Sequence, residues 1–514
     1  MLSSLHAPLH SGTRQGTINQ LDGWITANKP SHSQSTSISS RMRSTPIHWL
    51  SGSPGSGKTS IQLHLAKRCR QDSRLLASFF FSMNSVGSNE LHKKFVPSLA
   101  YQLTSTVPGL QSFVSTAIQN DPDMFSKPPG QQMTALVFKP LEECLKNSTG
   151  WAYWRRRFKA SLFHRHRSPD SDLDSKSSKL LEESTAFRNL YSEWWTRNII
   201  IIDALDECIG PREQQAIARL IFWASRHSPK FPLRFIISAP AQHPIIRNLF
   251  NECRVGMLSN TRLDTRVADA DIRAYLEAEF AKIKDSDSQS EIVWPEGWPG
   301  RNTVDRFVGK SKNLFIYASI IISFVQNTTG NPVELLDLLL SSLPDQAQRT
   351  DGGADYNQFA ELDALYTFIL HYHRSTGRNP PDNIQGDSVL DLRRQVLHAI
   401  MFSGRNFKSQ SELDDYLAVP LESADVALRD LHPIIFIPPL QPSSHSPKSP
   451  VAEAKIWFRH KSMWDFLVTK ERSGDFHQAL PEDRMTRIQK LQAADGMENI
   501  PDSRFWAITE PPPE

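Results

Sequence analysis

The pattern of apolar positions divides the first half of the chain into short continuous runs separated by helical stretches. Most of the runs are rich in β-branched or aromatic residues, which is typical of strands buried on both faces of a sheet. The runs lie at 47–50, 75–82, 199–203 and 233–238. Between the second and third, residues 91–107 carry apolar side chains at the spacing of an amphipathic helix. Strands that alternate with helices predict an α/β fold with a parallel sheet.

The second half of the chain is helical by pattern. Residues 264–345 include a stretch with Ile272, Leu276 and Phe280 on one helical face. The apolar run 314–325 is too short to span a bilayer, so it predicts a buried helix. We expect these segments to form a helical subdomain that follows the sheet and covers one side of the cleft in which a ligand would bind.

From about residue 360 the pattern changes again. Helical segments are expected at 362–371, 389–402, 411–418 and 423–431, and β-like runs at 433–438 and 455–459. The stretch 439–451 is rich in Pro and Ser and joins the two runs like a hairpin loop. Helices followed by a hairpin predict a winged-helix-like domain.

The first strand leads into a glycine-rich loop and then a helix. The loop reads Gly52-Ser53-Pro54-Gly55-Ser56-Gly57-Lys58-Thr59-Ser60. Its glycines let backbone N–H groups approach a phosphate, and the helix N-terminus that follows favours an anion. Lys58 can reach the β- and γ-phosphate oxygens, and Thr59 can hold Mg²⁺. The pattern predicts a Walker A loop that binds a nucleotide.

A second acidic motif follows the most apolar strand. The run 199–202 consists of isoleucine and ends at Asp203, which is the expected Walker B partner of Mg²⁺. Asp206 and Glu207 lie just past the strand end, where the crevice of a parallel sheet opens. Either carboxylate could orient the water that attacks a γ-phosphate. The alternative is a solvated acidic turn after a buried strand, which the upstream P-loop disfavours.

These motifs resemble those of NACHT-domain ATPases of the fungal NOD-like receptor type, which are related to the nephrocystin-like N-terminal module. They belong to the STAND class of signalling P-loop ATPases. The matching strings lie at 48–52, 76–82, 97–103, 202–208, 271–276 and 313–318, and the resemblance covers roughly residues 12–470. It implies a cytoplasmic ATP/ADP switch in innate-immunity-like or incompatibility signalling, with slow hydrolysis of ATP. It also implies self-association when ATP replaces ADP, and an unidentified protein partner.

The resemblance implies a role for His460. It also shows one position at which this chain differs from its relatives. In relatives the matching histidine meets the β-phosphate of bound ADP and holds the receptor closed; a structural surface histidine is the alternative. Relatives commonly carry a γ-phosphate-sensing arginine where this chain has Ala239. A cation there would stabilise the transition state, so its absence favours a second hypothesis, a nucleotide-binding scaffold without significant hydrolysis. Arg234 or Arg247 could compensate.

Composition limits the classes of partner that we expect for this protein. The chain has 514 residues, of which 39% are hydrophobic and 22% charged, and a formal net charge of +3. This charge is too small to indicate nucleic acid or an acidic membrane as the main partner. The expected recognition helix at 422–430 is acidic, so we expect no nucleic acid. No transmembrane segment is expected, and the four separated cysteines indicate cytosolic thiols.

The predicted organisation has five parts. They are a flexible lead with a short helix at 1–44, the NTPase core at 45–262, the helical lid at 263–358, the winged-helix-like domain at 359–475 and a tail at 476–514. Residues 148–197 interrupt the core with basic, aromatic and then polar residues, and we interpret them as an insertion. A surface insert, or a gene-model artefact such as a retained intron, is favoured over binding to nucleic acid or anionic lipid.

Overall fold

The computed structural model describes residues 9–26, 45–82, 91–147, 198–208, 210–226, 233–241, 243–245, 247–248, 257–263, 267–286, 292–328, 330–343, 359–373, 386–438 and 455–479. The expected insertion at 148–197 lies outside them, as do residues 1–8 and 27–44 of the N-terminal lead and most of the C-terminal tail.

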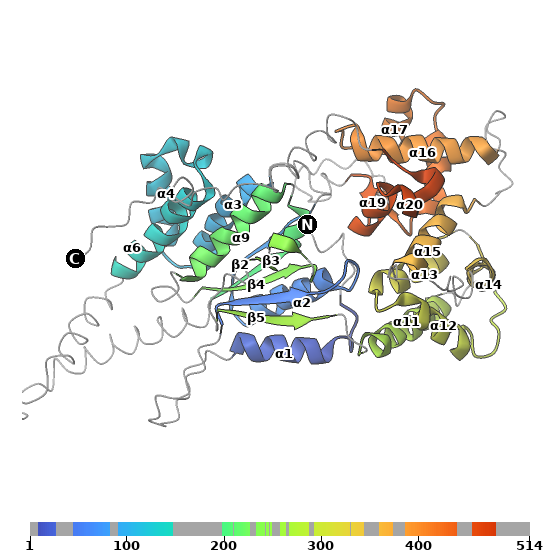
Figure 1. The fold of residues 1–514 in the computed structure, drawn as a ribbon, viewed down its shortest axis with the longest axis horizontal. Helices are drawn as coiled ribbons and strands as arrows, with labels where there is room; N and C mark the ends of the chain where they lie inside the picture. The colour runs from blue at the N-terminus through green and yellow to red at the C-terminus, as the bar shows by residue number, and fades with distance from the viewer. Residues whose placement is uncertain are drawn as a thin grey trace, which may run out of the picture.

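A five-stranded parallel sheet forms the centre of the first half (Figure 1). Its strands are β1 (Ile47–Ser51), β2 (Leu75–Phe80), β3 (Ile199–Asp203), β4 (Arg234–Ala239) and β5 (Leu258–Arg262), in the order β2-β3-β4-β1-β5. The predicted parallel α/β sheet is therefore confirmed. β5 was not predicted, because this edge strand is short and mostly polar.

Both faces of the sheet are covered, and the isoleucines of β3 explain how. Ile199 and Ile201 pack with α1 (Gln15–Thr26) and α2 (Lys58–Gln71) in one apolar cluster. Ile200 and Ile202 face the other cluster. That side is covered by α3 (Leu91–Thr106), α4 (Leu110–Asn120), α5 (Pro129–Met133), α6 (Lys139–Asn147) and α9 (Pro211–Arg226), with the short turns η3 (Pro122–Ser126) and η4 (Thr134–Phe138). Successive side chains of β3 thus pack alternately against the helices on the two faces of the sheet.

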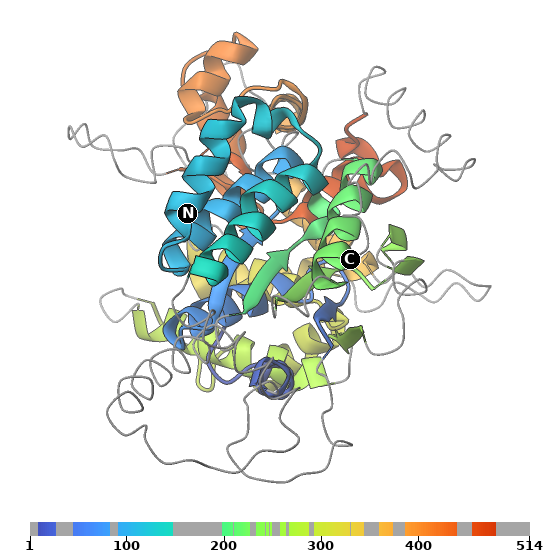
Figure 2. The ribbon, with the colours of Figure 1, turned by 90° about the vertical axis from the view of Figure 1, so that its left-hand side faces the viewer.

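The N-terminal helix α1 is part of the fold. It runs along the sheet in Figure 1 and is seen end-on in Figure 2. Its Leu21 and Ile25 are buried, and Arg234 at the start of β4 anchors its last turn. The Arg234 guanidinium lies 3.6 Å from the Trp24 ring centroid and donates to the Trp24 and Ile25 carbonyls at 2.7 and 3.2 Å.

The C-terminal region is largely helical and lies beside the sheet, at the carboxyl ends of its strands (Figure 1). Its helices are α11 (Val267–Ser286), α12 (Arg301–Ser311), α13 (Phe315–Asn327), α14 (Pro332–Ser342), α15 (Ala360–His371), α16 (Gly386–Phe402), α17 (Gln410–Leu417), α18 (Ser423–Leu428), α19 (Lys461–Leu467) and α20 (Lys470–Ser473), with the turns η6 (Arg429–Leu431) and η8 (Gly474–Phe476). The antiparallel pair β6 (Ile435–Phe436) and β7 (Trp457–Phe458) follows η6. The predicted helices and hairpin are therefore present.

One apolar cluster runs through this whole region, from Ala268 to Phe476. The expected lid and winged-helix-like parts therefore share a core. Helix α13 is buried within it, as its apolar run predicted. No helix in the described part of the chain is both long and apolar enough to cross a membrane.

Candidate nucleotide-binding site

The loop between β1 and α2 has the backbone that its glycines permit. Gly55 and Gly57 adopt φ values of 82° and 91°, a left-handed conformation that disfavours other residues. Gly57 is the N-cap of α2, so the helix begins at the loop. The Ser56 hydroxyl is buried and has no hydrogen-bond partner among the described residues. A polar loop at a helix N-terminus with an unused buried hydroxyl fits an anionic ligand.

Lys58, Thr59 and Ser60 form the first turn of α2. The Lys58 ammonium curls back over the loop and donates to the carbonyl oxygens of Gly52 and Ser53 at 2.9 and 3.0 Å. This brings its charge to the loop residues whose N–H groups would face phosphate. The ammonium therefore lies against the backbone at the start of the loop.

Asp203 ends β3 next to this turn and is 1% exposed. Its carboxylate accepts hydrogen bonds from the hydroxyls of Ser238 and Thr59. Burial raises the pKa of Asp203 to about 6, although both hydrogen bonds and the Lys58 cation work against this rise. The structure thus brings together Thr59 and Asp203, the two residues expected to hold Mg²⁺.

These two groups suit a shared Mg²⁺ site. Among the described residues, no group of three or more His, Cys, Asp and Glu side chains could hold a metal ion without other ligands. Mg²⁺ is commonly held by one or two protein groups, with waters and substrate phosphates filling the other positions. A bound Mg²⁺ would add positive charge beside Asp203 and favour its ionised form.

Asp206 and Glu207 lie in the turn η5 (Leu205–Glu207), which follows Ala204 in a left-handed conformation. Residues outside the turn hold it in place through hydrogen bonds. The Gln214 amide donates to the carbonyls of Asp206 and Cys208 at 3.2 and 2.7 Å, and its oxygen lies 3.1 Å from Nε2 of His243. Sequence patterns did not identify Gln214 or His243. Their contacts hold the backbone of the turn at Asp206 and Cys208.

A lysine from the far end of the chain reaches Asp206. Lys461 Nζ lies 3.0 Å from Asp206 Oδ2, and their side chains are 22% and 12% exposed. Burial would raise the pKa of Asp206, but the Lys461 and Lys58 cations hold it below its usual value. The pKa of Lys461 is raised, because the carboxylates of Asp206, Asp465 and Glu207 outweigh its burial. Lys461 was also missed by sequence analysis.

The top of the loop meets the C-terminal region. The Ile316 amide, in the first turn of α13, donates to the Gly55 carbonyl at 3.1 Å. A Cβ atom on Gly55 would stand 2.4 Å from Ile316 Cγ2 and 3.9 Å from His460 Cε1. The structure therefore places both Ile316 and His460 directly against the P-loop.

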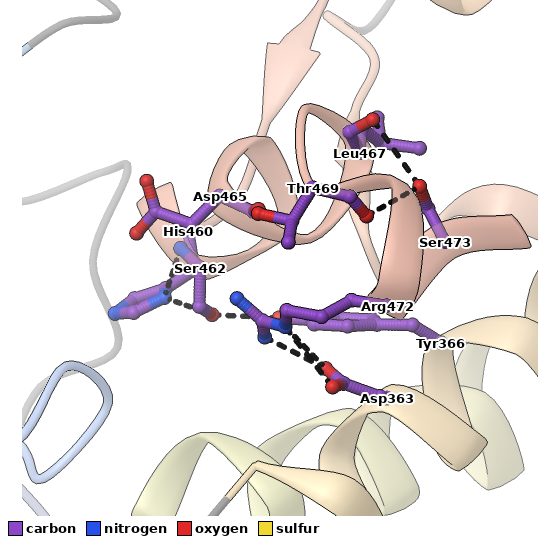
Figure 3. A network of polar contacts seen from close by, with 9 residues as sticks. All are labelled: Asp363, Tyr366, His460, Ser462, Asp465, Leu467, Thr469, Arg472 and Ser473. Atoms are coloured by element: carbon purple, nitrogen blue, oxygen red, sulfur yellow. Dashed lines mark hydrogen bonds and ion pairs between the residues drawn. The ribbon is translucent and has the colours of Figure 1, made fainter. Parts of the chain in front are cut away.

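His460 is held by a polar network (Figure 3). It is the N-cap of α19, and its Nδ1 accepts from the Ser462 amide at 3.0 Å and lies 2.6 Å from the Ser462 hydroxyl. That hydroxyl is 2.8 Å from the buried Tyr366 hydroxyl of α15. Since Nδ1 accepts a backbone N–H, the neutral ring carries its proton on Nε2. The opposite ring edge is therefore a donor, and Figure 3 shows the ring projecting away from the other labelled side chains.

The N-terminal lead also reaches the loop, through Arg14. This buried guanidinium donates to the Ser56 carbonyl at 3.0 Å and to the Leu263 carbonyl at 3.2 Å. It also lies 4.9 Å from the Phe315 ring centroid. Arg14 therefore ties the P-loop to the end of β5 and the start of α13. A lone arginine outside the motifs carries no local pattern that would reveal this.

The arginines considered as replacements for a sensor at Ala239 lie elsewhere. Ala239 ends β4 and is buried. Arg234 stands at the opposite end of the same strand, bound to α1, so it cannot reach the carboxyl end of the sheet. The Arg247 residue is exposed. The suggestion that Arg234 replaces the sensor arginine is therefore wrong, because Arg234 and Ala239 lie at opposite ends of β4.

The comparison with protein families agrees with part of the resemblance. The family described as "Nephrocystin 3, N-terminal" matches residues 24–154. This range includes the P-loop and its helix, and it ends before Asp203 and His460. No curated protein is similar enough to this chain to count as a relative. Residues 24–154 are thus similar to the N-terminal region of nephrocystin 3, and they contribute β1 and β2 to the parallel sheet.

Proposed function

We propose that this protein is an ATP/ADP-binding signalling switch of the NACHT type. The observation that carries the proposal is the meeting of four groups at one end of the sheet: the glycine-rich loop, Lys58, the Thr59–Asp203 pair and the His460 ring. The loop and Lys58 would bind phosphates, and Thr59 with Asp203 would hold Mg²⁺. The proposal includes a cytoplasmic location and self-association in the ATP-bound form.

The C-terminal region would act as the moving part. Its contacts with the loop pass through Ile316, His460 and Lys461, whose partners are Gly55 and Asp206. A ligand that interacts differently with the closed and open arrangements shifts the balance between them. In the proposed cycle, ADP favours closure through a hydrogen bond from His460 Nε2–H, and ATP favours closure less because its γ-phosphate crowds the C-terminal region.

His460→Leu tests the switch. One such hydrogen bond is worth about 1 to 3 kcal/mol, so we expect ADP affinity to fall about tenfold and self-association to increase. The measurement is ADP calorimetry together with sedimentation of both proteins in ADP. The fold should survive, because Met463, Phe466 and Leu467 remain buried behind the histidine. Identical ADP affinity and identical monomer fractions would make His460 structural.

Hydrolysis is proposed to depend on the turn after β3. Glu207→Gln should leave ATP affinity nearly unchanged and lower any phosphate release, because only the orientation of the attacking water is lost. The measurement is single-turnover release of phosphate from ATP. Unchanged release in the variant would contradict the role of this carboxylate.

The second hypothesis, a scaffold that binds nucleotide without significant hydrolysis, keeps one supporting observation. β4 ends in the buried Ala239, and Ser238 beside it is bound to Asp203. This strand therefore offers no cation to a γ-phosphate from those two positions. A wild type that binds ATP and releases no phosphate would favour the scaffold over the ATPase.

A further inference from the structure

The ion pair between Lys461 and Asp206 links residues that are 255 positions apart. Lys461 is the first residue of α19, directly after His460, and Asp206 stands in the turn after β3. Both side chains are largely buried, with a hydrogen bond of 3.0 Å between them. Removing one partner from such a pair leaves the other charge uncompensated, so it couples the two regions more strongly than a surface pair would.

The pair belongs to a larger group of charges around the P-loop. Lys58 acts on both Asp203 and Asp206, and Asp206 acts in turn on Asp203. Lys461 also interacts with the carboxylate of Glu207. Lys461 thus brings a positive charge from α19 to the carboxylates that are expected to bind Mg²⁺ and to orient the attacking water.

Two other largely buried ion pairs of the C-terminal region have a different role. Lys310 of α12 pairs with Glu361 of α15 at 3.2 Å, and Arg472 of α20 pairs with Asp363 of α15 at 2.7 Å (Figure 3). Each joins two helices of the same region. Lys461 instead reaches the turn after β3, although Asp465 of its own helix also acts on its charge.

We propose that Lys461 recognises the γ-phosphate of a bound triphosphate, leaving Asp206 for that phosphate. The inference rests on the proposed nucleotide site and deepens it, because it names a cation for the position where β4 supplies Ala239. A terminal phosphate carries more negative charge than one carboxylate and offers several acceptor oxygens. A diphosphate lacks that group, and the pair with Asp206 then persists.

This exchange has a consequence for both partners. While Lys461 holds Asp206, its ammonium occupies Oδ2 of that carboxylate and makes the carboxylate a weaker base toward a water molecule. Once the ammonium moves to phosphate, Asp206 becomes available and α19 exchanges its contact with the turn after β3 for a contact with the nucleotide. One side chain would therefore distinguish ATP from ADP and report the difference to the C-terminal region.

The test compares a triphosphate with a diphosphate. We expect Lys461→Met to lower the affinity for AMP-PNP with Mg²⁺ about tenfold and to change ADP affinity less than about twofold. Lys461→Arg, which keeps the charge, should retain most of the difference between the two nucleotides. The matched control is Lys310→Met, which removes a similarly buried lysine of the same region, whose partner is Glu361. Calorimetry gives the affinities, and thermal unfolding verifies that each variant folds.

Asp206→Asn supplies a second, opposite signature. Asp206 is the strongest carboxylate partner of Lys461, with Asp465 and Glu207 acting more weakly, so removing its charge should raise AMP-PNP affinity by about threefold or more. In that background Lys461→Met should cost more affinity than it does in the wild type. A structural ion pair would instead give variants that weaken both nucleotides equally.

The outcomes separate this inference from the proposed function. A wild type that binds neither nucleotide overturns both. A wild type that binds both, with the same ratio of affinities in Lys461→Met, overturns only the role of Lys461. Equal losses for AMP-PNP and ADP would likewise assign Lys461 to the fold and not to the phosphate.

Discussion

Lys58→Ala should weaken the binding of both ATP and ADP by about 2 to 4 kcal/mol, which is roughly 30- to 1,000-fold in affinity. The wild-type ammonium lies against the start of the loop, on the carbonyls of Gly52 and Ser53. Phosphates in this partly desolvated site would lose the charge that opposes theirs. Calorimetry with each nucleotide measures the effect.

The control for this variant lies on the same helix. Lys67 is an exposed lysine of α2, so Lys67→Ala removes the same side chain from the same element without touching the loop. We expect its affinities to match those of the wild type. Equal affinity in wild type and Lys58→Ala would contradict the nucleotide site itself, and with it the switch.

The central sheet was predictable because its strands carry a strong local pattern. Every residue of β3 is buried, and a run of four isoleucines suits few environments other than a central parallel strand. β5 was missed because it is an edge strand in which only Thr261 is buried, so its sequence has no continuous apolar run. A strand shows a continuous apolar pattern where its residues are buried. Edge strands are less buried, so their pattern is weak.

The candidate site was predictable only in part, and the reason is distance along the chain. The loop and Asp203 belong to motifs whose residue types and spacing identify them. The contacts of Arg14, Gln214 and Lys461 join segments far apart in sequence, and single charged or polar residues have no periodicity to mark them. Such contacts depend on how elements pack, which local sequence patterns do not reveal.

Gly55→Ala should oppose closure of the C-terminal region over the loop, even without nucleotide. The residue has a φ of 82°, and an added Cβ would stand 2.4 Å from Ile316 Cγ2. The left-handed backbone costs roughly 1 to 2 kcal/mol with a side chain, and the overlap adds about 1 to 3 kcal/mol. We expect much faster hydrogen exchange at the Ile316 amide, whose acceptor is the Gly55 carbonyl.

Gly404→Ala controls for left-handed backbone strain elsewhere, in the C-terminal region, and Ile316→Ala relieves the clash itself. Gly404 also has a positive φ, of 72°, but an added Cβ there would meet nothing within 4 Å. It therefore carries the backbone strain without the clash, and exchange at Ile316 should stay as in the wild type. Ile316→Ala removes the atom nearest the new Cβ, so it should partly restore protection in Gly55→Ala. If Gly55→Ala left exchange at Ile316 unchanged, the loop and α13 would not be in contact, and closure could not pass through this glycine.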